Sequence, residues 1–385
     1  MLTMDERILK MQLKELIKFK KDDGIVIRGP NVQSKAIINP ARHLKYYSVN
    51  KETEEIMAHN LKWVKNGEGD PRFQFVYIML PTSCNQVCRG CFTGQDKSKL
   101  LANLDGPFFR NEELEAILGT AKQVGVQAVI YAGGGELFTW KSAFDYIDRI
   151  IGHGLGMVIF TNGTLLSNAE IAWVNDRNIA LIISIRDTIE AKHNQLVGRP
   201  HFRLALKTIE ECLRLGMQGD GRLAVEMPVT INNENRALND LLPFCRALGI
   251  VPWIEEFIQI STSNEEQSVC HDFGRAREFF QKMAAKDAEL GIVWSPEHGT
   301  RMIDQPQCRR PLYSFTVYPN GDVVDCPSHS RKYGNLKEEP LERILDSERV
   351  REVFRLFEYC PCSVFYTDGD EQIPLALPDY LEELR

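Results

Sequence analysis

Six short apolar segments alternate with helix-like segments between residues 73 and 290, and this pattern constrains the fold more than any other feature. The strand-like segments are FQFVYIML (73–80), VQAVIYA (126–132), GMVIFTNG (156–163), IALIISI (179–185), RLAVEMPVTI (222–231) and IVPWIEEFIQI (250–260). The helix-like segments are 111–125, 142–154, a stretch that begins near Ser167, 202–215, 236–248 and 273–290. Short apolar strands joined by amphipathic helices predict an α/β fold with a parallel sheet covered by helices. Six such units fit either a doubly wound sheet or an incomplete barrel.

Unusual residues follow the first four of these strands. They are CNQVCRGC (84–91), GGGE (133–136), TNG (161–163) and SIRDT (184–188). In parallel α/β folds, ligands bind at the carboxyl ends of the strands. We therefore expect the four segments to converge on one site.

Composition and charge narrow the class of protein. The chain has 385 residues, which fits one large domain with extensions or two to three domains. Its formal net charge of −7 does not favour a nucleic-acid partner, because such partners bind basic faces. No apolar stretch reaches the length of a membrane span, and the N-terminal sequence lacks the apolar core of a signal peptide. We expect a cytoplasmic protein that binds neither nucleic acid nor membranes.

Ten cysteines are present, and seven of them fall into two clusters. The first cluster is Cys84, Cys88 and Cys91, and the second is Cys308, Cys326, Cys360 and Cys362. In a reducing compartment, clustered cysteines bind metal or carry out redox chemistry more often than they form disulfides. A closed zinc site needs four protein ligands, so the first cluster is one ligand short. Three thiolates can instead hold an iron–sulfur cluster that leaves one iron open.

The C-x3-C-x2-C loop after the first strand, followed by GGE after the second, resembles the radical S-adenosylmethionine (SAM) superfamily. The resemblance covers roughly residues 73–300 and implies a partial (β/α)6 TIM-like barrel. It implies that Cys84, Cys88 and Cys91 hold a [4Fe–4S] cluster whose open iron binds SAM. Reductive cleavage of SAM would then give a 5′-deoxyadenosyl radical, which abstracts a hydrogen atom from a substrate. A structural zinc site is the alternative for these cysteines.

The same resemblance implies which residues bind SAM. They are Gly134, Gly135, Glu136, Thr161, Asn162, Ser184 and Arg199. The GGE stretch corresponds to the segment that binds the methionine amino group, and glycine lets the backbone approach a ligand closely. Thr161, Asn162 and Ser184 fall where relatives contact the ribose and the carboxylate of SAM. The arginine would pair with the SAM carboxylate through two parallel hydrogen bonds. The alternative for GGGE is a simple tight turn, and the alternative for Arg199 is a solvated surface arginine.

The second cysteine cluster accompanies a predicted hairpin, FTVYPNGDVVDC (315–326), whose Asn-Gly turn carries Cys326 back toward Cys308. An amphipathic helix and Cys360-Pro361-Cys362 follow. The order C-x12-G-x4-C, GNL, helix and terminal cysteines resembles the SPASM/Twitch extension of radical SAM enzymes. Four cysteines match the shorter Twitch form, which implies one auxiliary [4Fe–4S] cluster without an open iron. Four cysteines also suit a zinc site.

Three domains are predicted from these patterns. They are an N-terminal extension (1–72), the partial barrel (73–300) and a hairpin-plus-helix iron–sulfur domain (301–385). The extension should contain a helix over 4–20, a hairpin over 24–38 and a helix over 51–65, and the turn-rich NGEGDPR (66–72) ends it.

Two residues are candidates for catalysis. Cys270 could supply a hydrogen atom or a proton to a radical intermediate, and Glu255 could bind a substrate hydroxyl or amine, or act as a base. By resemblance to Twitch dehydrogenases, the favoured substrate is a small sugar or aminoglycoside-like intermediate of natural-product biosynthesis, oxidised with the help of the auxiliary cluster. The alternative is a maturase that acts on a ribosomally made peptide. In either case a flavodoxin or ferredoxin would supply electrons. From a different class, a non-catalytic zinc-binding interaction protein would explain the cysteines alone.

Overall fold

The computed structural model describes residues 44–46, 51–67, 69–79, 83–91, 109–256, 273–292, 309–327 and 331–355. The predicted helix over 4–20, the predicted hairpin over 24–38, and Cys270, Cys308, Cys360 and Cys362 lie outside the described residues. The chain divides into two compact units. The first unit holds Met1–Ser48, Cys84–Gln95 and Ile159–Ser295, and the second holds Val49–Ser83, Asp96–Val158 and Pro296–Arg385. The predicted domain boundaries near residues 72 and 300 stay predictions.

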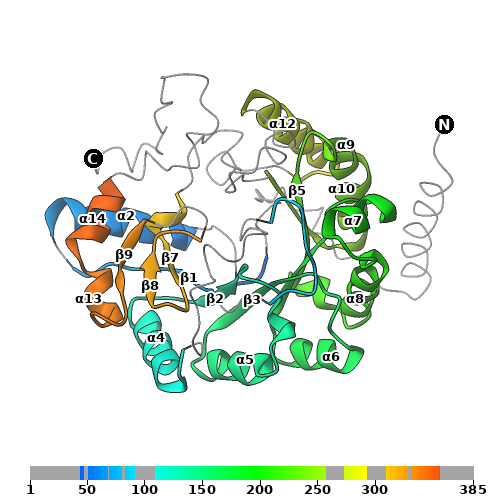
Figure 1. The fold of residues 1–385 in the computed structure, drawn as a ribbon. Helices are drawn as coiled ribbons and strands as arrows, with labels where there is room; N and C mark the ends of the chain where they lie inside the picture. Colours follow the sequence, from blue (N-terminus) through cyan, green and yellow to red (C-terminus); the bar gives the residue numbers. More distant parts are fainter. Residues whose placement is uncertain are drawn as a thin grey trace. The chain divides into compact units, whose positions relative to one another are not determined.

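The strands of the first unit follow the order β6-β5-β4-β3, of which β3 and β5 are labelled in Figure 1. They are β3 (Gly156–Thr161), within which the division between the units falls, β4 (Ala180–Ser184), β5 (Leu223–Val229) and β6 (Val251–Glu256). Strand β5 pairs in parallel with both β4 and β6. Most residues of β4 and β5 are buried, as expected for runs of Leu, Ile and Val in a parallel sheet.

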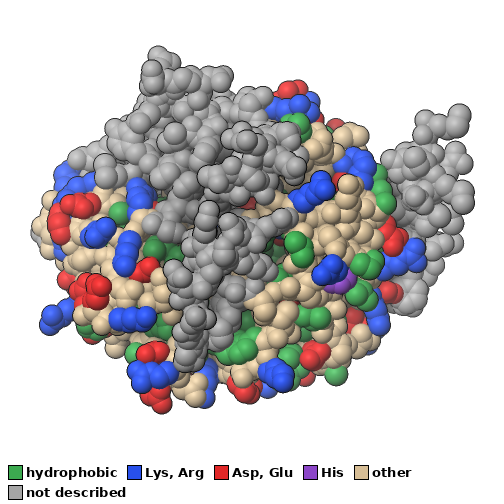
Figure 2. Space-filling view, viewed as in Figure 1, with side chains coloured by type: hydrophobic (Ala, Val, Ile, Leu, Met, Phe, Trp, Pro, Cys, Tyr) green, Lys and Arg blue, Asp and Glu red, His purple; other side chains and the backbone are tan. Residues whose placement is uncertain are grey.

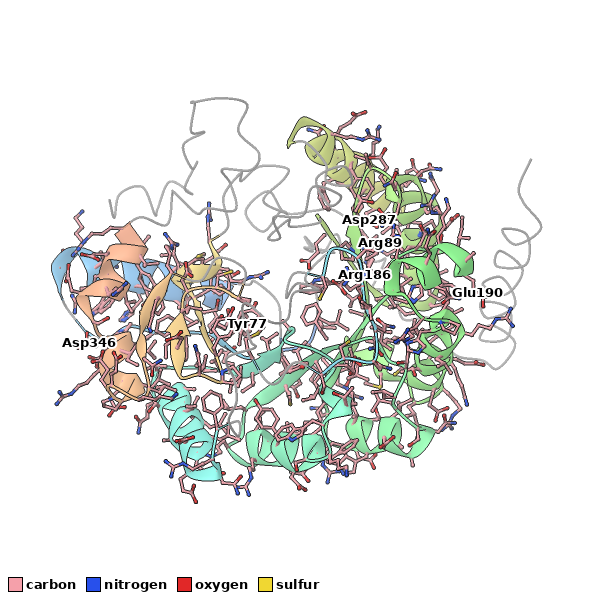
Figure 3. The ribbon with its side chains drawn as sticks, viewed as in Figure 1. Tyr77, Arg89, Arg186, Glu190, Asp287 and Asp346 are labelled. Carbon is pink, nitrogen blue, oxygen red and sulfur yellow. The ribbon has the colours of Figure 1, made fainter. Side chains whose placement is uncertain are left out.

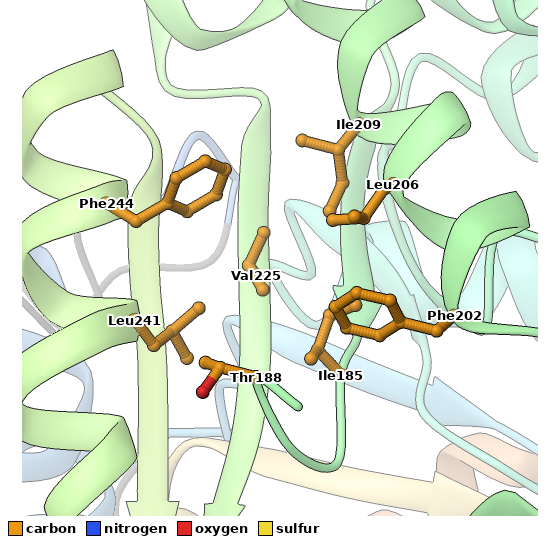
Figure 4. Close-up of a pocket in the computed structure, with 8 residues that line it drawn as sticks. All are labelled: Ile185, Thr188, Phe202, Leu206, Ile209, Val225, Leu241 and Phe244. Carbon is orange, nitrogen blue, oxygen red and sulfur yellow. The ribbon is translucent and has the colours of Figure 1, made fainter. Parts of the chain in front are cut away.

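The helices of the first unit connect these strands. They are α6 (Asn168–Asp176), α7 (Glu190–Val197), α8 (Phe202–Arg214), α9 (Glu234–Arg236), α10 (Leu242–Leu248) and α12 (Phe273–Glu289), with a 3-10 helix η2 (Met217–Asp220) and a π-helix η3 (Ala237–Leu241). Helices α8 and α10 cover the same face of β4 and β5, where Ile209 and Phe244 line a small apolar cavity with Val225 (Figure 4). The other face of these strands is therefore the one that is free to form a site.

The sheet of the first unit is curved. Phe160 on β3 and Trp253 on β6 meet edge to face, with ring centroids 5.9 Å apart. Two strands lie between β3 and β6, and in a flat sheet a spacing of about 4.8 Å per strand would hold them about 14 Å apart. The two rings therefore meet across a concave face, as in the wall of a barrel.

One row of residues on this concave face is set by the strand register. Ser184 on β4 lies beside Glu226 on β5, and Glu226 lies beside Trp253 on β6. Since side chains alternate along a strand, Val225 points to the helices and its neighbour Glu226 points to the concave side. The same alternation places Glu255 on the side of Trp253.

The strands of the second unit follow the order β2-β1-β7-β8-β9. They are β1 (Phe75–Ile78), β2 (Ala128–Tyr131), β7 (Ser314–Val317), β8 (Asp322–Val324) and β9 (Lys332–Asn335). Strand β1 pairs in parallel with β2 and β7, whereas β8 is antiparallel to β7 and β9. The helices are α2 (Lys51–Asn66), α4 (Asn111–Gln123), α5 (Ala143–Gly152), α13 (Leu341–Leu345) and α14 (Glu348–Arg355), with 3-10 helices η1 (Leu137–Thr139) and η4 (Arg310–Leu312).

Aromatic side chains join the helices and strands of the second unit. Trp63 of α2 is fully buried and meets Phe354 of α14 edge to face at 6.0 Å between ring centroids. Phe73 contacts both Phe354, at 6.1 Å, and Phe315 of β7, at 5.0 Å. The carboxyl-terminal hairpin and helix of the described chain are thus built into the core around β1.

The predicted α/β fold with a mostly parallel sheet is confirmed. The predicted hairpin is also confirmed, because β7 and β8 are joined by a turn in which Gly321 adopts φ +89°. Helix α7 and strand β9 were not predicted, since EAKHNQLV and KYGN carry few apolar residues. The predicted helix over 236–248 is interrupted by the π-helix η3 before α10 begins.

The visible surface of the described residues mixes charges of both signs, with acidic and basic side chains interspersed (Figure 2). Within the part of the chain that the structure describes, no helix has the length and apolar character that crossing a membrane requires.

Candidate functional site

The cysteine loop, residues 84–91, is tied by its backbone to helix α7 of the first unit. The Val87 N–H donates to the Val197 carbonyl at 3.0 Å, and the Arg89 N–H donates to the carbonyl of the preceding residue of α7 at 2.8 Å. Gly198 ends α7 with φ +67°, and a Cβ atom there would lie 3.3 Å from the Val87 carbonyl oxygen. Glycine therefore allows the loop to lie closely against the end of the helix.

Side-chain hydrogen bonds join the cysteine loop to the TNG segment after β3. The Asn162 amide donates to Asn85 Oδ1 at 2.8 Å, and the Asn85 amide donates to Thr164 Oγ1 at 2.8 Å. Thr164 donates to Asn162 Oδ1 through its backbone N–H at 3.0 Å and through its hydroxyl at 2.6 Å. The three side chains close a ring that holds the loop at the carboxyl end of β3. Asn162, a predicted SAM contact, is thus brought to the cysteines.

The three thiols of the loop are half-buried and form no disulfide. Burial raises the pKa of the Cys88 thiol to about 11, the Arg186 charge opposes this rise, and Cys91 and Cys84 add to it. The sulfurs are therefore close enough to sense one another's charge. Thiolates are the donors that iron–sulfur clusters use, so this set of residues fits a [4Fe–4S] cluster. Among the described residues, no group of three His, Cys, Asp or Glu side chains is arranged to hold a single metal ion. A [4Fe–4S] cluster does not require such a group, because each cysteine binds a different iron.

Arg186 and Glu226 also face this site, and sequence analysis did not single them out. Burial lowers the pKa of Arg186, but the negative charges of Glu226, Cys88 and Cys91 outweigh this effect and leave the pKa raised. Arg186 lies two residues after the end of β4 and is labelled together with Arg89 of the cysteine loop in Figure 3. The sequence SIRD (184–187) contained a signal for Arg186. Related sequences commonly read S-x-D, and Arg186 stands at the position of that aspartate.

The other predicted residues of the first unit lie at the same end of the sheet. Thr161 is buried and accepts a hydrogen bond from the Gly163 N–H at 3.0 Å. The Ser184 hydroxyl is buried on the concave face and has no hydrogen-bond partner in the described chain. Arg199 is exposed just after α7, where its guanidinium donates to the Gly198 carbonyl at 3.2 Å. Glu255 is half-buried on β6. Their predicted contacts with SAM or substrate stay predictions.

The GGGE segment lies in the second unit, directly after β2. Gly133 and Gly134 adopt φ of +148° and +94°, a conformation that glycine accepts without strain. Glu136 is buried and accepts a hydrogen bond from the Phe138 N–H at 3.4 Å, at the start of η1. The Glu136 N–H in turn donates to the Ser83 carbonyl at 2.9 Å, next to the first cysteine in the sequence. The turn therefore anchors the strand end that leads into the cysteine loop.

Cys326 is the only predicted ligand of the second cluster among the described residues, and it is buried just after β8. Its neighbour Asp325 pairs with Arg331, with 2.7 Å between Oδ2 and Nε. Burial raises the pKa of Asp325, whereas Arg331 lowers it, and the net shift is upward. Tyr333 on β9 is buried nearby, and burial raises its pKa, with a further rise from Asp325. The surroundings of Cys326 are thus largely shielded from water.

Comparisons with known proteins agree with this arrangement. Residues 308–364 match SPASM, an iron-sulfur cluster-binding domain. No curated protein matches the chain. The solved structure of anSMEcpe with bound AdoMet is similar, with 15% sequence identity, a TM-score of 0.56, and coverage of 81% of this chain and 95% of that chain. SuiB of Streptococcus suis, bound to the precursor peptide SuiA, is also similar, with 18% identity, a TM-score of 0.56, and coverage of 80% and 73%.

The chain shares the fold of these two structures, and the part of the chain that matches SPASM follows the six strand–helix units. The predicted partial TIM-like barrel and the predicted SPASM-type extension are therefore confirmed. The SPASM match contains all four cysteines of the second cluster, of which Cys326 is described. An iron–sulfur domain is thus supported over the zinc alternative for this part of the chain.

Proposed function

We propose that this protein is a radical SAM enzyme that cleaves SAM reductively and abstracts a hydrogen atom from its substrate. The observation that carries the proposal is the cysteine loop. Its three thiols, which form no disulfide, lie on a loop that is held by α7 on one side and by the ring of Asn85, Asn162 and Thr164 on the other. Three ligands preorganised at the carboxyl ends of parallel strands suit a cluster with one open position.

A [4Fe–4S] cluster on Cys84, Cys88 and Cys91 would supply the electron that cleaves SAM into methionine and a 5′-deoxyadenosyl radical. The chain's own residues bind and orient. Ser184, with its buried hydroxyl, and Asn162, beside the cysteines, are our candidates for contacts with SAM from the first unit. Arg199 stays a candidate for the SAM carboxylate, and Gly134, Gly135 and Glu136 stay candidates for the amino group.

The concave face supplies the substrate side of the site. Trp253 and Phe160 form an apolar wall, which excludes water from a radical intermediate. Glu255 lies on the same face and is our candidate for binding a substrate donor or accepting a proton. Cys270 stays a candidate hydrogen donor. An auxiliary [4Fe–4S] cluster held by Cys326 and its three partner cysteines would carry the electron that a substrate oxidation releases.

For the substrate we propose a ribosomally made peptide. SuiB, one of the similar structures, is bound to a precursor peptide, and a further anSMEcpe structure with 14% identity and a TM-score of 0.56 holds AdoMet and the Cp18Cys peptide. The small sugar-like substrate that the sequence favoured stays a prediction without support from these two structures. A flavodoxin or ferredoxin is the proposed reductant.

The test is anaerobic purification followed by iron analysis and assay of SAM cleavage. We expect brown protein with about eight iron atoms per chain, which two [4Fe–4S] clusters require. With dithionite as reductant, the wild type should form 5′-deoxyadenosine, and Cys84→Ala should form none. The matched control is Cys212→Ala, which changes a buried cysteine of α8 outside the site and should leave SAM cleavage intact. Colourless protein that contains zinc, or 5′-deoxyadenosine from Cys84→Ala, would contradict the proposal.

The substrate class is tested separately. Short peptides encoded beside this gene would be incubated with the reduced enzyme and SAM, and analysed by mass spectrometry. A modified peptide, together with deuterium transfer from a labelled peptide into 5′-deoxyadenosine, would support the peptide assignment. If an aminocyclitol stimulates SAM cleavage and no peptide does, the result would contradict the peptide assignment and favour the small-molecule substrate.

A further inference from the structure

We propose that Arg186 sets the reduction potential of the cluster held by the cysteine loop, by placing a permanent positive charge beside its ligands. This inference rests on the proposed function, because it requires a cluster at Cys84, Cys88 and Cys91. Arg186 is a positioning residue in this proposal and takes no part in bond making.

The backbone of Arg186 is held from two sides. Its N–H donates to Nδ1 of His193 on α7 at 3.2 Å, and its carbonyl accepts a hydrogen bond from the Asn233 amide at 3.2 Å. Both partners are buried. The preceding residue, Ile185, donates to the Glu226 carbonyl at 2.8 Å, which continues the pairing with β5. The Cα position of Arg186 is therefore fixed between α7 and β5.

The cysteine loop is fixed to the same helix. Residues of the loop donate two backbone hydrogen bonds to the carbonyls at the end of α7, one turn after His193. A single rigid element thus carries both the loop and the residue that orients Arg186. This shared support fixes the backbone of Arg186 relative to the loop, and the guanidinium is hydrogen-bonded to Cys88 and interacts with Cys91.

The Arg186 guanidinium interacts with the cysteine sulfurs directly. The charges of Cys88 and Cys91 act on it, together with that of Glu226, and its side chain is hydrogen-bonded to Cys88. The Arg186 charge in turn lowers the pKa of the Cys88 thiol, against the larger effect of burial. Arg186 therefore keeps a positive field at the cysteine sulfurs.

The physical consequence follows from the charge of the cluster. Three thiolates outweigh the two positive charges of an oxidised [4Fe–4S] core, and reduction adds another negative charge. A nearby guanidinium stabilises the reduced form more than the oxidised form, and net charge and hydrogen bonds at the sulfurs are known determinants of cluster potential. Arginine stays protonated over the working pH range, so the effect does not depend on pH. Glu226 should act in the opposite sense.

The experiment is an EPR-monitored redox titration of the reconstituted full chain without SAM. The relevant signal is the one that Cys84→Ala lacks, which separates it from an auxiliary cluster. At the wild-type midpoint potential, we expect the ratio of reduced to oxidised cluster to fall about tenfold in Arg186→Gln, which corresponds to about 59 mV for one electron. Arg186→Lys keeps the charge and should stay within about twofold of the wild type.

Glu226→Gln is the opposing variant. Removing this negative charge should raise the ratio of reduced to oxidised cluster, whereas damage to the fold would not produce shifts of opposite sign in the two variants. If Arg186→Gln fails to retain iron, Glu226→Gln decides alone: an upward shift supports the proposal and an unchanged midpoint overturns it. If Arg186→Gln retains iron with an unchanged midpoint, the proposal is overturned, even where SAM binding is weakened.

Failure of the inference and failure of the proposed function are distinguishable. A chain that assembles a [4Fe–4S] cluster and cleaves SAM, but whose potential is insensitive to both variants, refutes only the role of Arg186. A wild-type chain that assembles no cluster on the cysteine loop refutes the proposed function itself.

Discussion

Replacing His193 with asparagine should make the stability of this protein less sensitive to acid. His193 is fully buried on α7, and burial lowers its pKa from 6.5 to about 4, with further lowering by Arg186 and His201. Its Nδ1 accepts the Arg186 N–H, so the neutral ring is the form that the fold holds. Asparagine can still accept this hydrogen bond through Oδ1, but it does not titrate.

The sign and size follow from linkage. As pH falls, the unfolded chain protonates His193 near pH 6.5, whereas the folded chain does so only near pH 4. The stability that His193 contributes is complete above about pH 6.5 and is lost as pH falls from there to about 4. The full pKa difference corresponds to about 3.4 kcal/mol, and between about pH 7 and pH 5 the loss is about 2 kcal/mol.

The assay is urea unfolding of the metal-free protein at about pH 7 and pH 5, followed by far-UV circular dichroism. The loss of unfolding free energy between the two pH values should be about 2 kcal/mol smaller in His193→Asn than in the wild type. Phe202→Leu is the matched control, because Phe202 packs edge to face on the His193 ring at 5.2 Å. It should lower stability similarly at both pH values. The reasoning is refuted if His193→Asn keeps the wild-type loss between pH 7 and pH 5.

Two further predictions concern packing and charge in the first unit. Val225→Ile should stabilise the protein by about 0.8 kcal/mol, because the added methylene enters the apolar cavity of ≈ 20 Å³ between β5 and helices α8 and α10. Val229→Ile, at a buried position of β5 outside the cavity lining, should destabilise it in the same thermal unfolding assay, and equal effects would contradict the cavity argument. Asp187→Asn should cost about 3–5 kcal/mol in urea unfolding, because it leaves the Arg236 charge without its carboxylate at a mostly buried site. Arg203→Ala breaks a more exposed pair and should cost less than about 1 kcal/mol, so similar losses in the two variants would refute the burial argument.

Much of the fold was predictable because its signals are local. The strands Ala180–Ser184 and Leu223–Val229 fall inside apolar runs, and the Asn-Gly turn before Asp322 sets a hairpin through the conformation of Gly321 alone. Helix Glu190–Val197 escaped prediction because its apolar positions are few. It is held by partners that are distant in the sequence, such as the cysteine loop.

In the candidate site, too, the local features were predictable from the sequence and the long-range contacts were not. The spacing of Cys84, Cys88 and Cys91 was enough to predict a metal centre, since three thiols within one short loop need no distant contact to lie close together. Asn162 was predicted to contact SAM, but its hydrogen bond to Asn85 became visible only in the structure.

The sequence by itself determined the alternation of strands and helices, the cysteine loop, and the hairpin of the carboxyl-terminal domain, because each depends on residues close together in the chain. Only the tertiary structure decided that Arg186 and Glu226 face the cysteines, and that burial holds His193 neutral. These properties arise where β4, β5, α7 and the cysteine loop meet. Burial and electrostatic interaction depend on distance in space, which the order of residues does not state.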